Sequence, residues 1–271
     1  MHTTENGKKN QTVALTIAGS DSGGNAGIQA DIRAFHVFGL HACTVVAALT
    51  AQNPYGVRSV MVPDVAFIAD QLDAVFEEYN ISALKTGMLA TAAVIETVAA
   101  KLAAHIGVAK VIDPVMIATS GAKLLEDDAI GAMKEKMLPL ATLATPNLPE
   151  AGVILGVEIS SKAQMEEAAV EIHRRYGCAV LVKGGHKTDD LAEDVLCDAE
   201  GISWYSSPMI KKPLSTHGTG CSLSAAIAAS LARGNDLRTA VGEGKKYVTE
   251  SIRNSLYVGR RATVLGTPSQ I

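Results

Sequence analysis

TVALTIAGSDSGGNAGIQADIRAFHVF, residues 12–38, predicts the first unit of an α/β fold. Its first part, residues 12–18, is a short apolar run that ends in Gly-Ser-Asp, which is typical of a buried strand entering a loop. From Ala26 to Phe38 apolar residues recur at helical spacing, and Gly39 follows as a stop signal. This stretch therefore predicts a strand, a glycine-rich loop and a helix, in that order.

The same alternation continues along the chain. Strands are predicted at residues 43–49, 57–62, 83–86, 110–112, 143–145 and 179–182, and helices at 64–79, 91–105, 126–136 and 161–176. A hairpin is predicted around Glu200-Gly201, and two helices, from Thr219 and from Asp236, are predicted to close the chain. Strands that alternate with helices predict a mostly parallel central sheet covered by helices on both faces. Ligands of such sheets bind beyond the carboxyl ends of the strands, where nearly every unusual polar cluster of this chain falls.

Length and composition limit the class of protein. The 271 residues contain no repeat, low-complexity block or long linker, so we predict one domain over residues 12–271 after a flexible polar tail at 1–11. The tail has no signal-peptide core, which favours a cytoplasmic location. A net charge of −4 and 4% aromatic residues argue against nucleic acid or anionic membrane as partners. The four cysteines are far apart and contain no CxxC pair, which argues against a disulfide framework or a zinc site.

The segment STHGTGCSLSAA, residues 215–226, predicts an anion hole. Glycines allow a backbone to approach a ligand closely, and the start of a helix offers unpaired N–H groups and a positive dipole end. Cys221 lies at this helix start, so we expect its thiol to ionise more easily than a free one. His217 beside the hole is better explained by capping or packing.

Three motifs with an acidic residue lie at predicted strand ends, and each also has a purely structural explanation. Asp21, in AGSDSGGNAG, could hold a substrate hydroxyl or ring nitrogen, or could simply form a turn. Asp113, in DPVM, could bind Mg²⁺, or could be a solvated loop aspartate. In TPNLPE, Asn147 is suited to cap a helix whose first turn holds Pro149, and Glu150 with Asp113 would supply two hard oxygen ligands.

Three further residues carry weaker signals. Lys183, at a strand end before two glycines, could reach phosphate oxygens or lie at an ordinary turn. Gln52 can donate and accept hydrogen bonds together, which suits an aminopyrimidine edge. Met88, taken alone, is more typical of core packing.

Together these motifs resemble the hydroxymethylpyrimidine/phosphomethylpyrimidine kinases of thiamine biosynthesis, within the ribokinase-like superfamily. The resemblance extends from Ala14 to about Ser255. It is carried by LTIAGSDSGGNAGIQAD (15–31), ALTAQN (48–53), KTGML (85–89), DPVM (113–116), TPNLPEA (145–151), VKGGH (182–186) and HGTGCSLSAAIAA (217–229). It implies a three-layer ribokinase-like α/β fold and ATP-dependent phosphorylation of a hydroxymethyl group, possible also on the monophosphate product.

The resemblance also implies roles for individual residues. Asp21 and Gln52 would hold the pyrimidine, and Met88 and Val115 would line its pocket. An anion hole with a catalytic cysteine would be formed by Gly218, Thr219, Gly220 and Cys221. Mg²⁺ would be associated with Asp113 and Glu150, and the ATP phosphates with Asn147, Lys183 and Lys245. The family further suggests a homodimer.

Three other functions remain to be compared with this one. Pyridoxal kinases share the fold and the cysteine site, although Gln52 favours an aminopyrimidine. A silent nucleotide or vitamin sensor would be expected to lack Asp113, Glu150 or Cys221, all of which are present. A cysteine acyl-transfer enzyme could pair Cys221 with His217, but would leave the two acids unexplained. The chain departs from the family in lacking a proline after Asp21 and a histidine-containing ending after Gly259.

Overall fold

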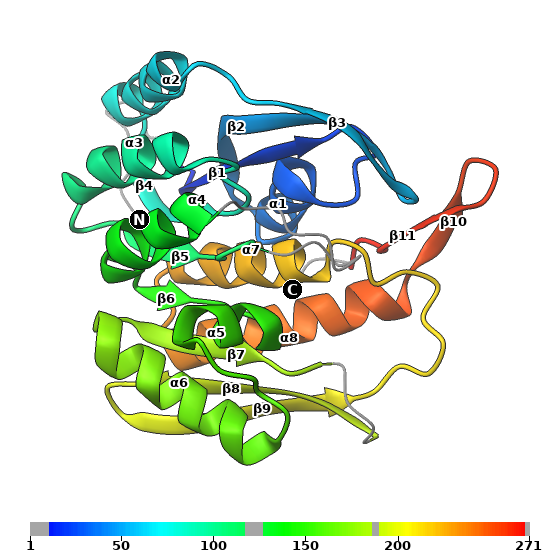
Figure 1. Ribbon diagram of the computed structural model, residues 1–271. Coiled ribbons are helices and arrows are strands. Elements are labelled where there is room, and N and C mark those ends of the chain that lie inside the picture. Colours follow the sequence, from blue (N-terminus) through cyan, green and yellow to red (C-terminus); the bar gives the residue numbers. More distant parts are fainter. Residues whose placement is uncertain (1–10, 117–126, 186–189, 269–271) are drawn as a thin grey trace.

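The computed structural model describes residues 11–116, 127–185 and 190–268, and a nine-stranded sheet crosses this part of the chain (Figure 1). The strand order is β3-β2-β1-β4-β5-β6-β7-β8-β9. The strands are β1 (Val13–Asp21), β2 (His41–Asn53), β3 (Gly56–Met61), β4 (Ile81–Thr86), β5 (Ala109–Ile112), β6 (Leu143–Ala144), β7 (Ala179–Lys183), β8 (Leu191–Asp198) and β9 (Gly201–Pro208). Strands β2, β1, β4, β5, β6 and β7 are parallel neighbours, whereas β3, β8 and β9 are antiparallel. The predicted mostly parallel sheet and the hairpin at Glu200-Gly201 are confirmed.

Helices cover both faces of the sheet (Figure 1). One layer contains α1 (Gly27–Val37), α7 (Thr219–Ala232) and α8 (Leu237–Arg253), and the other contains α2 (Val65–Glu78), α3 (Ala92–Ala103), α4 (Asp127–Ala132), α5 (Leu148–Leu155) and α6 (Lys162–Tyr176). Successive strand residues alternate between the layers: Val111 packs with the α7 side and Ile112 with the α3 side. Central strands buried on both faces therefore appear in the sequence as continuous apolar runs.

Local sequence signals explain where most helices begin. Asp64 and Asp236 accept hydrogen bonds from the backbone N–H groups of Ala66 and Thr239, so both cap helices that the sequence predicted to start at about these residues. Ser161 forms a capping box with Gln164 at the start of α6. Helix α7 is rich in alanine, and its small side chains let it lie against β4 and β5 at the centre of the molecule.

The structure corrects two predictions of secondary structure. Helix α8 does not close the chain, because a small antiparallel hairpin follows it, formed by β10 (Leu256–Val258) and β11 (Ala262–Val264). These strands are short and outside the core, so they leave no buried apolar run in the sequence. The helix predicted at 126–136 begins in the described residues at Asp127, and it passes into a π-helical segment (Met133–Met137) and a 3₁₀ turn (Leu138–Leu140).

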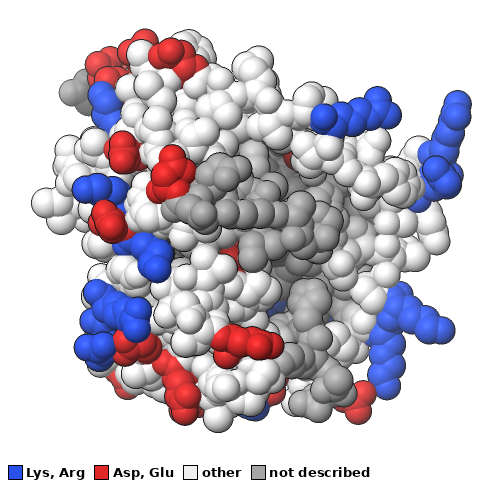
Figure 2. Space-filling view, in the orientation of Figure 1, with Lys and Arg blue, Asp and Glu red and all other residues white. Residues whose placement is uncertain are grey.

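Some sequence predictions concern residues outside the described ranges. Most of the predicted tail lies there, as do His186 of the VKGGH motif and the last three residues. Gln11, the last residue assigned to the tail, donates a hydrogen bond from Nε2 to the carbonyl of Gly39. Among the helices that the structure describes, none combines the length and apolar character needed to cross a membrane. Figure 2 shows acidic and basic side chains mixed on the left side of the visible face, with several basic side chains along its right margin.

Candidate active site

The loop between β1 and α1 is organised around Asp21. The Asp21 carboxylate is almost fully buried and accepts hydrogen bonds from the amides of Gly23, Asn25 and Ala26 at 2.7, 2.9 and 2.9 Å. Burial alone would raise the pKa of Asp21, but the neighbouring His217 and the three amides outweigh it and lower the pKa to about 2. Asp21 is therefore a fixed anion that shapes this loop, and its contact with a substrate stays a prediction.

The β1–α1 loop packs tightly against the start of α7. Gly218 has a φ of 87°, and a Cβ atom built there would lie 2.0 Å from the carbonyl oxygen of Asn25. Gly27 has a φ of 57°, and a Cβ atom there would lie 2.2 Å from the carbonyl oxygen of Gly19. Only glycine fits either position. Gly218 precedes α7 without a side-chain cap, so the predicted cradle of Gly218, Thr219, Gly220 and Cys221 is an uncapped helix start.

Cys221 lies on the first turn of α7 and is half-buried. Burial raises the pKa of its thiol above the ordinary value, although Lys85 opposes this rise and the amide of Gly27 donates a hydrogen bond to the sulfur. The expectation that the helix start alone would make this thiol more acidic is wrong. The reason is that removing the sulfur from water outweighs the favourable dipole and charges nearby. The other three cysteines, Cys43, Cys178 and Cys197, are buried free thiols.

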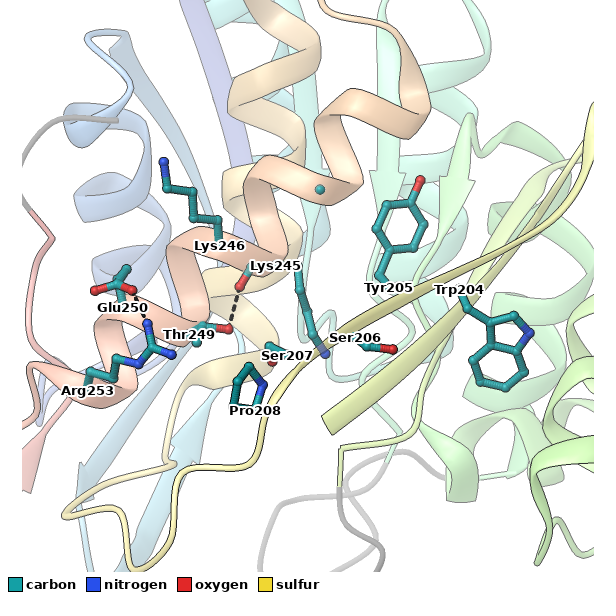
Figure 3. A pocket seen from close by; sticks show the side chains of 11 residues that line it. Trp204, Tyr205, Ser206, Ser207, Pro208, Lys245, Lys246, Thr249, Glu250 and Arg253 are labelled. Carbon is teal, nitrogen blue, oxygen red and sulfur yellow. Dashed lines mark hydrogen bonds and ion pairs between the residues drawn. The ribbon is translucent and has the colours of Figure 1, made fainter. Parts of the chain in front are cut away.

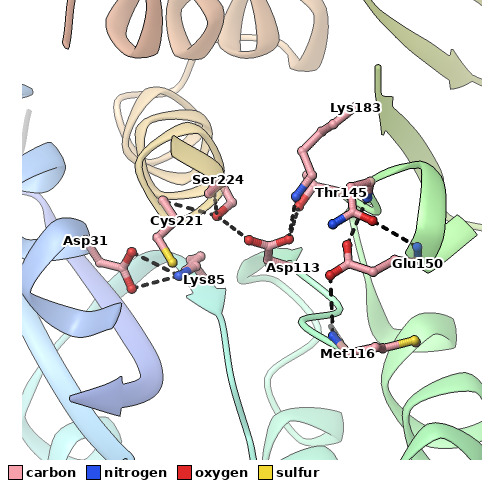
Figure 4. A network of polar contacts seen from close by, with 11 residues as sticks. Asp31, Lys85, Asp113, Met116, Thr145, Glu150, Lys183, Cys221 and Ser224 are labelled. Carbon is pink, nitrogen blue, oxygen red and sulfur yellow. Dashed lines mark hydrogen bonds and ion pairs between the residues drawn. The ribbon is translucent and has the colours of Figure 1, made fainter. Parts of the chain in front are cut away.

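Polar side chains from four elements meet at the carboxyl ends of β5 to β7 (Figure 4). Lys183 Nζ lies 2.8 Å from Asp113 Oδ1, and the hydroxyl groups of Thr145 and Ser224 each lie 3.2 Å from an Asp113 oxygen. Asp113 is nearly inaccessible to solvent. Burial would raise its pKa, but Lys183 and Lys85 more than compensate, so the Asp113 pKa is below its usual range. The structural alternative, a solvated loop aspartate, is therefore wrong.

Asn147 and Glu150 form a capping box at the start of α5. The Asn147 side-chain oxygen accepts a hydrogen bond from the backbone N–H of Glu150 at 2.9 Å. In return, Glu150 Oε2 accepts one from the backbone N–H of Asn147 at 2.8 Å. Met116 N also points to Glu150 Oε1, at 3.4 Å. Burial raises the pKa of Glu150 to about 7; Lys183 opposes this and the Asp113 charge adds to it. Glu150 therefore takes part in the helix cap that the sequence predicted, and its interaction with the Asp113 charge shows that the two predicted acids lie near each other.

Gln52 lies at the end of β2 and faces His217 across the site. The two Nε2 atoms are 3.2 Å apart, and the Thr50 hydroxyl lies 3.2 Å from Gln52 Oε1. His217 Nε2 is also 3.8 Å from Asp21 Oδ2. His217 therefore links two predicted substrate contacts, a role that its sequence position did not reveal because the partners are distant in the chain.

Two apolar residues complete the predicted substrate region. Met88 follows β4, and a Cβ atom at Gly19 would lie 2.8 Å from its Cε, so Met88 packs against the β1 end. Val115 is partly buried two residues beyond Asp113, whose carbonyl accepts its N–H.

Lys245, on α8, forms an ion pair with Asp194, which lies beside Lys183 at the carboxyl end of β7. Its Nζ lies 2.6 Å from Asp194 Oδ2, and Asp194 Oδ1 accepts the Gly184 amide at 3.0 Å. A groove of about 480 Å³ between β9 and α8 begins at Lys245 and includes Trp204, Tyr205 and Lys246 (Figure 3). Gly184, which follows Lys183, therefore shares Asp194 with Lys245, and Lys245 in turn lines this groove.

Sequence reasoning missed a buried ion pair beneath the site, formed by Asp31 and Lys85. Both belong to quoted motifs, and a lysine inside an apolar strand is an anomaly that could have drawn attention to it. In the described part of the chain, His, Cys, Asp and Glu side chains form no group of three or more that could hold a metal ion. A metal at this edge would therefore depend on two carboxylates and on ligands from outside the protein.

The fold and its similarity to solved structures define this chain as a small-molecule kinase with a ribokinase-like fold. The model of the phosphomethylpyrimidine kinase family matches residues 21–265, and the chain belongs to this family. It is 45% identical over 246 residues to a thiamine biosynthesis bifunctional protein of Geobacter sulfurreducens, of which it spans half the length. It is 40% identical over 250 residues to a hydroxymethylpyrimidine/phosphomethylpyrimidine kinase of Staphylococcus aureus, covering 92% of this chain and 90% of that protein.

Solved structures agree with the fold and the kinase class. The ADP complex of Bacillus subtilis pyridoxal kinase superposes with a TM-score of 0.89 and 35% identity, covering 96% of this chain and 98% of that one. A phosphomethylpyrimidine kinase of Clostridium difficile gives a TM-score of 0.80 and 37% identity, covering 89% and 100% of the two chains. The first of these relatives binds a nucleotide, which supports ATP use by this chain.

Proposed function

We propose that this chain transfers the γ-phosphate of ATP to 4-amino-5-hydroxymethyl-2-methylpyrimidine, and then phosphorylates the monophosphate, in thiamine biosynthesis. The observation that carries the proposal is the meeting of three groups at one sheet edge. These are the uncapped start of α7 with Cys221, the Asp113–Lys183 pair, and Gln52. Relatives named for this activity cover almost the whole chain.

The pyrimidine would lie between Gln52, Met88 and Val115. The Gln52 amide has a second N–H and a further oxygen lone pair beyond its contacts with His217 and Thr50, and these match the amino group and ring nitrogen of an aminopyrimidine. Asp21 supports this contact by fixing the loop and the neighbouring histidine.

Cys221 would act as the base. In the transfer step the substrate O–H bond breaks and an S–H bond forms on the Cys221 thiolate, while a new O–P bond forms and the bond from the γ-phosphorus to its bridging oxygen breaks, releasing ADP. The amides from Gly218 to Cys221 would stabilise charge on the transferred group.

The nucleotide phosphates would lie near Asn147, Lys183 and Lys245. Lys183 and Lys245 are both largely buried cations held by carboxylates, and Asp194, the partner of Lys245, also accepts the amide of Gly184 directly after Lys183. Exchange of a carboxylate partner for a phosphate oxygen would let each lysine bind ATP without a large conformational change.

Asp113 and Glu150 fit a magnesium ion carried in with the nucleotide. Mg²⁺ is usually held by one or two carboxylates, with phosphate oxygens and water completing its shell, and the two acids here match that donor set. The ion would neutralise charge on the triphosphate. A nearby cation would also favour the ionised form of Glu150, which is disfavoured in its absence.

A coupled assay of ADP release against pyrimidine and pyridoxine alcohols, with and without magnesium, tests this function. We expect turnover with the hydroxymethylpyrimidine and its monophosphate, and loss of roughly 100-fold or more in kcat for Cys221→Ala. Nearly full turnover by that variant would reject the base assignment. Absence of ADP release with every alcohol would reject the kinase function and favour acyl transfer.

Pyridoxal kinase activity is the second candidate. It is favoured by the high structural similarity to the Bacillus subtilis pyridoxal kinase. A direct comparison of kcat/KM for pyridoxal and for the hydroxymethylpyrimidine decides between them, and we expect the pyrimidine to be preferred because of the Gln52 amide.

We also propose a cytoplasmic homodimer. The four cysteines are unpaired thiols, which suits a reducing compartment. The edge strand β3 and the start of α2 expose Val57, Val60, Met61 and Phe67, the last with 59% of its surface accessible. A second copy of this chain would cover this patch, since exposed apolar edges are otherwise prone to unspecific association. Sedimentation of the wild type and of Met61→Lys tests this, and a monomeric wild type would reject it.

A further inference from the structure

Asp31 and Lys85 form an ion pair with no solvent contact. Both side chains have 0% accessible surface, Lys85 Nζ lies 2.9 Å from each Asp31 oxygen, and the Thr16 hydroxyl donates to Asp31 Oδ2 at 2.6 Å. Desolvation of two charges often exceeds their mutual attraction, and apolar replacements are frequently as stable. Stability of the fold is therefore a poor explanation for a lysine in the apolar strand β4.

The pair lies directly beside Cys221. Figure 4 shows the Cys221 sulfur directed towards the Lys85 ammonium, with Asp31 on the far side of that ammonium. The Lys85 ammonium has three N–H donors, and its hydrogen bonds to the two Asp31 oxygens use two of them. The third donor remains for the side on which the Cys221 sulfur lies. A Cβ atom at Gly87 would lie 2.9 Å from Lys85 Nζ, so the ammonium also lies under the loop that carries Met88.

Charged groups from four elements surround the sulfur. They are Asp31 on α1, Lys85 on β4, Asp113 after β5 and Lys183 at the end of β7. Lys183 is engaged by Asp113 at 2.8 Å and Lys85 by Asp31, so each cation is held in place by one acid. Burial raises the Cys221 pKa, Lys85 has the largest effect among the groups that oppose this rise, and the carboxylates of Asp31 and Asp113 add to the rise with smaller effects than that of Lys85.

We propose that Lys85 is the fixed positive charge that stabilises the Cys221 thiolate, and that Asp31 positions it. Lys85 is thus a positioning residue that acts through Cys221 and keeps all its protons throughout the reaction. The proposal rests on the proposed function only in so far as Cys221 takes the substrate proton. The charge itself acts on the sulfur whether or not a substrate is bound.

The test uses the full-length protein without nucleotide and with a chelator. The rate at which iodoacetamide alkylates Cys221 is followed by mass spectrometry of its peptide between pH 7 and pH 12, and the midpoint reports the thiol pKa. Lys85→Met alone leaves Asp31 buried and unpaired and can fail to fold, so the decisive variant is the double Asp31→Asn, Lys85→Met. Its matched control is Asp73→Asn, Lys101→Met, which removes the half-exposed pair between α2 and α3.

We expect the Cys221 midpoint to rise by at least about one pH unit in the Asp31/Lys85 double variant and to stay unchanged in the control. We also expect kcat to fall at least about tenfold at pH 7 with little change in KM, because less thiolate is available. A folded double variant with wild-type midpoint and kcat would overturn the proposal and make the pair purely structural. If the midpoint shifts while the wild type phosphorylates no alcohol, the proposed function fails and the role of Lys85 in thiolate stabilisation stands.

Discussion

The Lys183 ammonium lies 2.8 Å from Asp113 Oδ1, although Asp113 follows β5 and Lys183 ends β7, two strands that are separated by β6. Neither partner is exposed to an appreciable extent, so this is a charge-assisted contact in a largely dry environment. Because β5 and β7 are both parallel to β6, their carboxyl ends present the two side chains at the same edge. If Lys183 binds nucleotide as proposed, phosphate and the Asp113 carboxylate would compete for this lysine.

Lys183→Met should weaken nucleotide binding. Loss of a charge-assisted contact to phosphate corresponds to about 1.5–3 kcal/mol, so the KM for ATP should rise roughly tenfold or more. Initial rates of ADP release at varied ATP concentration measure this. Lys162→Met removes an exposed lysine that pairs with Glu193 and should leave KM unchanged. Equal KM values for the two variants would argue against a phosphate contact by Lys183.

Asp21→Asn should destabilise the fold. Asparagine offers one oxygen to the three amides and turns N–H donors towards them. We therefore expect the free energy of unfolding at pH 7 to fall by about 2 kcal/mol. The wild-type pKa of about 2 is below the usual 3.8, so its contribution is present above pH 3.8 and disappears as the pH falls through 2. Urea unfolding should therefore show the same difference in unfolding free energy between the wild type and Asp21→Asn at pH 7 and at pH 4. This difference should become smaller only below pH 4. The surface variant Asp73→Asn should change stability by less than about 1 kcal/mol.

Gly218→Ala and Gly234→Ala separate backbone strain from close packing. Their φ angles are 87° and 88°, but a Cβ atom at Gly218 would meet Asn25 at 2.0 Å, whereas nothing lies within 4 Å of one at Gly234. Gly234→Ala should cost about 1–2 kcal/mol in unfolding free energy and leave kcat unchanged. Gly218→Ala should also displace the start of α7 and lower kcat about 100-fold. Similar kcat values for both variants would show that the loop contact does not shape the site.

Glu150 should make the stability of the nucleotide-free protein fall with rising pH. Its pKa is raised from 4.5 to about 7, so the folded protein holds this proton more tightly than the unfolded chain does. The resulting stability is complete below pH 4.5 and is lost as the pH rises through about 7. Denaturant unfolding between pH 5 and pH 8 should show that the unfolding free energy falls with rising pH in the wild type and in the exposed control Glu96→Gln. In Glu150→Gln the unfolding free energy should depend less on pH. An unchanged slope in Glu150→Gln would locate its origin elsewhere.

The order of strands and helices could be predicted because its causes are local. The apolar run before Asp21, the cap at Asp64 and the glycine stop at Gly39 each act within a few residues, and α/β alternation follows from their sum. Placement of the site at the carboxyl edge followed from the parallel sheet itself. The hairpin β10–β11 and the antiparallel direction of β3 did not follow, because short or exposed strands leave little hydrophobic signal.

The amino-acid sequence by itself determined the fold class, the family and most of the residues at the sheet edge. The tertiary structure alone decided which charges face one another: Lys85 is 54 positions from Asp31, and Gln52 is 165 positions from His217. It also decided that burial raises the pKa of Cys221 and of Glu150. Propensities and caps act between chain neighbours, whereas desolvation and Coulomb interactions depend on what packing brings together across the chain.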